Sequence, residues 1–160
     1  SCSEMTNRQV ARYRQHAPAL ALDVARCLED ADYPAELAQW VLAQPLAPAP
    51  LVYATTSPGE LARIQESHGQ QAASDAVEHC FARLAQRLQG TGVDGFIIAG
   101  GETSSRITQA LGVKAFHIGP QIAPGVPWVR AIDAPLSLAL KSGNFGDEDF
   151  FDKAQEYFHD

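Results

Sequence analysis

The sequence predicts an α/β domain in which helices cover both faces of a central, mostly parallel sheet. Three observations lead to this fold class. The chain has 160 residues, which is a common size for one domain. Short apolar runs alternate with segments of helical periodicity, as in layered α/β proteins. One of these runs, "GFIIAG" at 95–100, is apolar on both strand faces, as expected in a sheet that is covered on both sides.

The first third of the chain is predicted to alternate between helix and strand. The opening helix has capping-box spacing at Ser1 and Glu4 and is expected to end before Pro18. The segments that follow are a strand at 19–24 ("ALALDV"), a helix at Tyr33–Leu42 entered through Pro34, and a strand at 51–56 ("LVYATT").

The rest of the chain begins with the clearest helix of the sequence. Its apolar stripe is Val77, Cys80, Phe81, Leu84 and Leu88, with Ser74 as a candidate start and Gly90 as a candidate C-terminal residue. After the strand at 95–100 we expect a helix at Glu102–Leu111, a strand at 113–119, an irregular segment with three prolines at 120–132, a strand at 136–143 and a last helix at Asp147–Phe158.

Composition excludes several classes of function. The net charge is −7, which disfavours non-specific binding to nucleic acid or to an anionic membrane. No apolar stretch approaches the roughly 20 residues that span a bilayer. Three cysteines without a CxxC pair, and five histidines without ligand spacing, predict no metal site and fit a reducing, cytoplasmic compartment.

The segment "AGGETSS" at 99–105 suggests a place for an anion. Gly100 and Gly101 follow a buried strand, where ligands collect in α/β sheets. Glycine lets the backbone approach a ligand, and the first amides of the next helix favour phosphate. Thr103, Ser104 and Ser105 add hydroxyl groups. The alternative is a tight turn in which one of these hydroxyls caps the helix.

A second glycine-rich turn, "KSGNFGDEDFF" at 141–151, repeats the arrangement. Lys141, Ser142, Gly143 and Asn144 follow an apolar strand and precede an acidic helix start. Lys141 could meet a phosphate or simply reach solvent, and the acidic residues suit a helix N-terminus. Together the two turns predict a site for a phosphate-bearing ligand, most simply a nucleotide. Neither turn matches a P-loop or a dinucleotide-binding fingerprint.

Four motifs give this chain a family resemblance. "SCSEMTNRQV", "AGGETS", "GVPW" and "LKSGNFGDEDFF" occur in this order and together resemble the C-terminal, nucleotide-binding domain of the four-carbon acid sugar kinase family, in its 3-oxo-tetronate branch. The resemblance covers essentially all 160 residues. It implies a two-domain enzyme whose N-terminal, sugar-acid-binding domain is absent from this chain. A homo-oligomer stays open as its assembly state.

The resemblance also implies a ligand and a set of residues. The cofactors would be ATP and Mg²⁺, with no metal site built by the protein. The nucleotide-binding residues would be Ser1, Ser3, Gly100, Gly101, Glu102, Thr103 and Gly143, with Ser104, Lys141, Ser142 and Asn144 as secondary candidates. Trp128 could stack on adenine or lie in the core. No catalytic base is assigned. A non-catalytic nucleotide- or anion-sensing module stays open as the alternative function.

Overall fold

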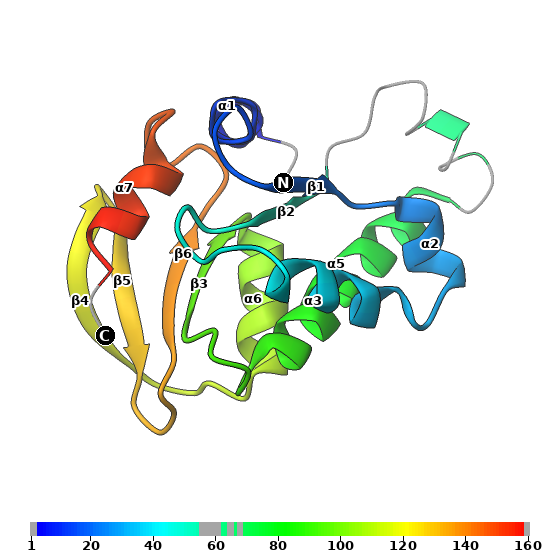
Figure 1. Ribbon diagram of the computed structural model, residues 1–160. Coiled ribbons are helices and arrows are strands. Elements are labelled where there is room, and N and C mark those ends of the chain that lie inside the picture. The colour runs from blue at the N-terminus through cyan, green and yellow to red at the C-terminus, as the bar shows by residue number, and fades with distance from the viewer. Residues whose placement is uncertain (1–2, 55–61, 64–65, 67–68, 159–160) are drawn as a thin grey trace.

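The fold consists of two small sheets with helices packed around them (Figure 1). The computed structural model describes residues 3–54, 62–63, 66 and 69–158. Within these residues the elements are α1 Glu4–Tyr13, β1 Ala19–Ala21, α2 Val24–Glu29, α3 Tyr33–Leu42, β2 Leu51–Tyr53, α5 Gln70–Leu88, β3 Gly95–Ala99, α6 Gly101–Ala110, β4 Phe116–Ala123, β5 Val126–Ala131, β6 Ser137–Lys141 and α7 Phe150–Glu156. The predicted α/β class is confirmed.

The larger sheet differs from the prediction in the direction of its strands. Its order is β3-β6-β5-β4, and only the β3–β6 pair is parallel, because β5 runs antiparallel to both of its neighbours. The expected central, mostly parallel sheet is therefore wrong for the described residues. The smaller sheet is the parallel pair β1-β2.

The cause of this error lies at 120–132, which we predicted to be irregular. These residues form the second half of β4, a tight turn, and β5. Gly125 in the turn has a φ of 80°, a conformation that glycine adopts without strain. Pro120 lies in an edge strand, where a missing amide hydrogen costs little, and the register shifts on either side of Gln121.

Several helix boundaries also move. The first helix is capped by Ser3 and not by Ser1, and it ends at Tyr13, well before Pro18. The long helix α5 begins at Gln70, ahead of Ser74, and Gly90 follows its end with a φ of 80° as predicted. The predicted helix at 147–158 is limited to Phe150–Glu156, whereas α3 matches its prediction at both ends.

Helices pack on both faces of the larger sheet. On one face α1 and α7 bring Val10, Tyr13, Phe150 and Phe151 against β5 and β6. On the other face α6 packs Ile107 against the sheet, and the cluster continues to Leu138 of β6. A third apolar cluster joins α3 and α5 to the smaller sheet. None of the described helices is long and apolar enough to cross a membrane.

Candidate functional site

The two glycine turns lie side by side at one edge of the larger sheet. They follow β3 and β6, which are parallel neighbours with Ala99 opposite Lys141. The amide of Gly100 donates a hydrogen bond of 2.7 Å to the carbonyl of Lys141. A side chain at Gly101 would come within 3.9 Å of the Ser142 hydroxyl. The sequence predicted each turn, and the structure places the two turns next to each other.

The first turn leaves the start of α6 without a side-chain cap. Gly100 is the N-cap residue, with a φ of 116°, and it makes no side-chain capping bond. Its carbonyl accepts the Ser104 amide at 2.9 Å, which begins the helix. The amides of Gly101, Glu102 and Thr103 precede that bond and have no partner within the helix. The alternative of a Thr or Ser cap is therefore wrong, and these amides can receive an anion.

The second turn folds over the side chain of Lys141, which is fully buried. Its Nζ donates to the carbonyl oxygens of Gly143 at 2.5 Å and Ser142 at 3.2 Å, and to the Thr6 hydroxyl at 3.0 Å. Lys141 is neither a phosphate contact in this arrangement nor a solvated strand end, which were the two predicted roles. Its ammonium group holds the turn in place through these hydrogen bonds.

The orientation of these carbonyls fixes the orientation of the next amides. In a trans peptide the C=O and the following N–H point in opposite directions. The carbonyls of Ser142 and Gly143 point inward to the ammonium. The amides of Gly143 and Asn144 therefore point away from Lys141, outward from the turn. This gives the second turn two donors that an anion could use.

Burial also changes the protonation of Lys141. Removing the ammonium from water lowers the pKa of Lys141 to about 8, well below its ordinary value of 10.5. The three oxygen partners are neutral dipoles, so the charged form is held by hydrogen bonds and not by a carboxylate.

Helix α1 supplies a row of polar side chains that we did not predict in full. The Ser3 and Thr6 hydroxyls each lie 2.8 Å from the carbonyl of Gly143. Gln9, fully buried, donates from its Nε2 to the carbonyls of Phe145 at 3.1 Å and Asp147 at 2.8 Å. Thr6 and Gln9 were missed. Their three-residue spacing from Ser3 places them on one helix face, which is the signal that could have indicated them.

The other predicted residues fall into three groups. Ser1 lies outside the described residues. Glu102, Ser142 and Asn144 are exposed beside the turns, whereas Thr103 and Ser104 are buried in the first turn of α6. Trp128 is a core residue, because its indole N–H donates to the carbonyl of Ala154 at 2.7 Å and its ring packs on Phe158.

Acidic side chains follow both turns, and those after the second turn, Asp147 and Asp149, pair with Lys153 and Arg12. The Glu102 carboxylate lies 3.8 Å from the Arg106 guanidinium on the surface of α6. Among the described residues no three His, Cys, Asp or Glu side chains gather in a way that could hold a metal ion. A metal ion at this site would therefore need the oxygens of a bound phosphate as its main ligands.

Comparison with protein-family models identifies the type of domain. Residues 1–151 match the model described as "Nucleotide-binding C-terminal domain". The chain belongs to this family. The two glycine turns described above thus lie in a domain whose family is described as nucleotide-binding.

The curated relatives of this family member are longer proteins with one shared name. The chain is 61% identical to a 3-oxo-tetronate kinase of Pectobacterium atrosepticum and 58% identical to one of Salmonella typhimurium. Each alignment covers 99% of this chain but only 38% of the relative.

Solved structures agree with the fold. A Haemophilus influenzae protein, HI1011, matches with a TM-score of 0.92 and 52% identity, over 99% of this chain and 39% of that chain. A Bordetella bronchiseptica protein, described as a domain-swapped dimer with bound citrate, matches with a TM-score of 0.78. The match covers 98% of this chain and 39% of that one. Because the identity is only 21%, this match supports the fold alone.

Proposed function

We propose that this chain is the ATP-binding domain of a two-domain kinase that phosphorylates a four-carbon sugar acid, converting 3-oxo-tetronate to its 4-phosphate. The observation that carries the proposal is the pair of glycine turns, which present amides at the ends of two adjacent strands. The family match and the shared name of the relatives support it. A purely sensory nucleotide module is not favoured, because relatives over half identical to this chain are named as kinases.

In this proposal the nucleotide phosphates lie between the two turns. The amides of Gly101, Glu102 and Thr103 would hold one phosphate at the start of α6. The outward amides of Gly143 and Asn144 would hold the next from the opposite side, while Ser3 positions the second turn through the Gly143 carbonyl. Phosphoryl transfer depends mainly on such positioning and on stabilisation of charge.

Mg²⁺ would supply charge neutralisation by bridging phosphate oxygens. Glu102 at the first turn has an exposed carboxylate, which could reach the ion through water. The acceptor sugar acid would bind to the other domain of the longer protein. The base that accepts the sugar hydroxyl proton would come from that domain as well.

The test is a pair of measurements on the purified chain. Calorimetry should show binding of Mg-ATP and ADP but little binding of NAD. ADP release should stay at the background rate with 3-oxo-tetronate, threonate or erythronate, and should become acceptor-dependent in the longer two-domain protein. Robust turnover by the 160-residue chain alone would place the acceptor site within it, against the proposal.

A further inference from the structure

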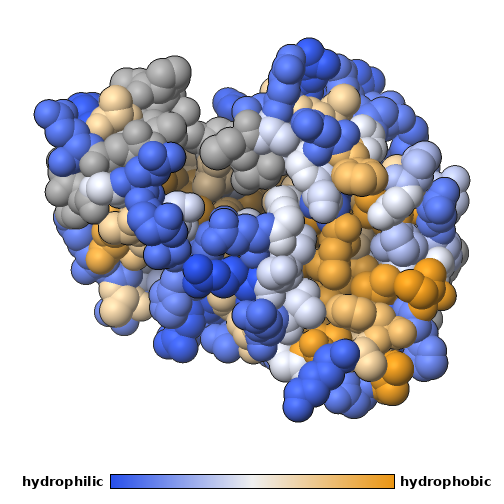
Figure 2. All heavy atoms as spheres, turned by 180° about the vertical axis from the view of Figure 1, so that it is seen from behind, coloured by the Kyte–Doolittle hydropathy of each residue, from blue (hydrophilic) through white to orange (hydrophobic). Residues whose placement is uncertain are grey.

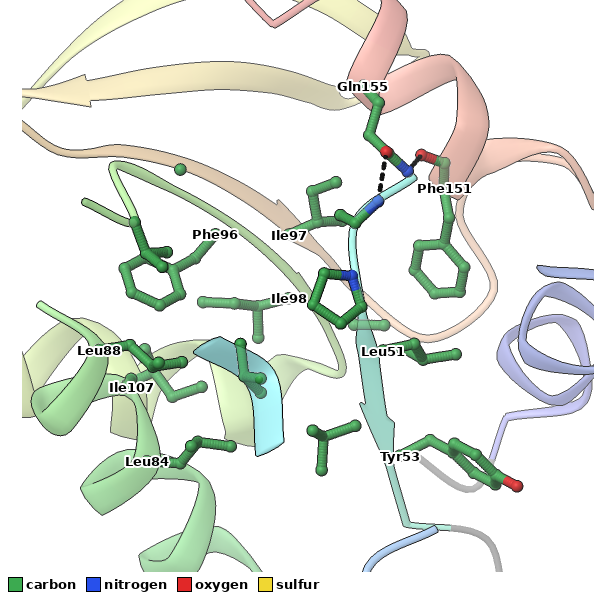
Figure 3. A pocket seen from close by; sticks show the side chains of 18 of the residues that line it. Leu51, Tyr53, Leu84, Leu88, Phe96, Ile97, Ile98, Ile107, Phe151 and Gln155 are labelled. Carbon is green, nitrogen blue, oxygen red and sulfur yellow. Dashed lines mark hydrogen bonds between the residues drawn. The ribbon is translucent and has the colours of Figure 1, made fainter. Parts of the chain in front are cut away.

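The two sheets face each other across a cavity, and no strand pairing joins them in the part of the chain that the structure describes. Among the described residues β2 pairs only with β1, and β3 pairs only with β6. A cavity of about 510 Å³ lies between the free edges of β2 and β3, lined by both strands and by the helices on either side (Figure 3). We call the space between these two edges the strand slot.

The backbone of β3 presents polar groups to the slot. Asp94 and Gly100 direct backbone groups toward β6, since the Asp94 carbonyl accepts the amide of Ser137 and the Gly100 amide donates to Lys141. Backbone direction alternates along a strand. The N–H and C=O groups of Gly95, Ile97 and Ala99 therefore point away from β6, into the slot.

The edge of β2 also presents backbone groups to the slot. The Leu51 amide donates to the carbonyl of Pro18 and the Tyr53 carbonyl accepts the amide of Leu22, both on the β1 side. The backbone groups of Val52, between them, therefore point into the slot from the opposite edge. Among the described residues neither of these edges has a further strand beside it, and a free strand edge is a template for pairing with another strand.

The walls of the slot are apolar on both faces. Leu84 and Leu88 of α5 line one side, and Phe151 of α7 lines the other, with Gln155 above it bonded to the backbone of Ala49 and Phe151 (Figure 3). A small apolar ligand could fill this volume, but it could not pair with both rows of backbone groups. A β-strand can do both, since it has polar edges and an apolar side chain on each face.

The start of the described chain lies at one end of the slot. Thr6 of α1 lines the cavity, and Ser3 contacts Gly143, which follows the carboxyl end of β6. A strand that entered α1 from the slot would thus run in the same direction as β2 and β3. The curated relatives have room for such a strand, since this chain spans 38% of their length.

We propose that the strand slot is occupied by a β-strand formed by the residues that immediately precede Ser1 in a longer polypeptide. This strand pairs with β2 on one edge and β3 on the other, joins the two sheets, and leads directly into α1 beside the glycine turns. The inference rests on the proposed function, which requires a longer, two-domain protein.

Hydrogen exchange at single amides tests this arrangement. The amides of Val52, Ile97 and Ala99 should exchange rapidly in the 160-residue chain and at least about tenfold more slowly in the longer polypeptide. The amide of Ile98, which points toward β6, is the matched control and should be protected in both. Unchanged exchange at the three slot amides in the longer polypeptide would overturn the proposal.

Other occupants give different results. Protection of the slot amides in the 160-residue chain at every concentration would mean that β2 and β3 pair directly, and protection that grows with concentration would mean a second copy. Either result overturns the proposal. Mg-ADP binding, measured on the same samples, separates the strand proposal from the proposed function. If the longer polypeptide binds Mg-ADP but its slot amides are not protected, only the strand proposal is wrong. If the slot amides are protected but Mg-ADP does not bind, only the nucleotide site is wrong.

Discussion

The Gly100 amide and the Lys141 carbonyl are joined by a 2.7 Å hydrogen bond that ties the two glycine turns together. The bond belongs to the last pair of the parallel β3–β6 ladder, Ala99 and Lys141. The backbone therefore fixes the spacing between the turns before any ligand arrives. Preorganised donors of this kind lose little entropy on binding.

Replacing Gly101 by Val should weaken ATP binding by at least about tenfold while leaving the fold intact. A side chain there would project into the space between the turns, and its nearest neighbour outside the turn is the Ser142 hydroxyl at an ordinary 3.9 Å. Titration calorimetry and a melting curve check the two parts. Gln109→Val, on an exposed position of the same helix, is the control and should bind ATP normally. Unchanged affinity in folded Gly101→Val would remove the first turn from the site.

ATP and ADP should raise the melting temperature in proportion to the logarithm of their concentration above Kd, because they bind only the folded state. NAD should raise it weakly or not at all, since the sequence has no dinucleotide fingerprint. Differential scanning fluorimetry over a ligand series makes the comparison. A larger shift with NAD than with ADP would contradict the nucleotide assignment.

Thr6→Val should destabilise the domain by about 1–3 kcal/mol and weaken nucleotide binding. The hydroxyl of Thr6 accepts from the Lys141 ammonium and donates to the Gly143 carbonyl, so its loss leaves one of the three N–H groups of the buried ammonium without an acceptor. Urea unfolding measures the first effect and calorimetry the second. Asn7→Ala, one position along and exposed, should change stability by less than about 0.5 kcal/mol. Equal effects of the two variants would mean that the Thr6 hydroxyl has no role in the turn.

The pH dependence of stability should reveal the buried ammonium. The pKa of Lys141 is about 8 in the folded state and near 10.5 in the unfolded state, so the unfolded chain binds more protons between these values. The contribution of Lys141 to the free energy of unfolding should therefore become more favourable to the folded state as the pH increases from 8 to 10.5. The difference in the free energy of unfolding between the wild type and Lys141→Met, measured against pH, isolates this slope. Tyr13, Tyr33 and the cysteines titrate in both proteins, so their effects cancel. A flat difference would show that Lys141 is not buried as described.

Sequence patterns predicted the two glycine turns of the site better than the buried residues that hold these turns in place. Two glycines after a strand, seen twice, indicated both turns, because glycine placement is local and visible in the sequence. The pairing of β3 with β6 depends on tertiary packing, which no local pattern records. The buried position of Lys141 and the inward row of Thr6 and Gln9 depend on where α1 docks, and the contacting residues are 135 to 138 positions apart in the chain.

The largest error, the direction of the strands, has a similar cause. Three prolines at 120–132 indicated an irregular segment, since proline usually disrupts sheets. In the structure the edge position of β4 accommodates Pro120, and the turn contains Pro124. Whether a strand lies at an edge is decided by the whole sheet and could not be predicted from these residues alone.

The exposure of β4, in the hairpin that it forms with β5, is as expected for a strand at the edge of the sheet. His117–Gln121 are exposed, and Ile118 is 75% accessible. Apolar side chains gather on this side of the molecule, over the region of β4 and the turn that follows β5, as Figure 2 shows from behind. Ile132, at that turn, is 55% accessible.

The two tryptophans of the chain, Trp40 and Trp128, make the two halves of the domain separately visible by fluorescence. Trp40 lies in α3 against the cluster around the smaller sheet, whereas Trp128 lies in β5 under α7. Variants that keep a single indole, Trp40→Phe or Trp128→Phe, would each emit from one side of the strand slot. Their red shifts during denaturation would report whether the halves melt together or one after the other, and therefore whether the domain is one cooperative unit without further chain in the slot.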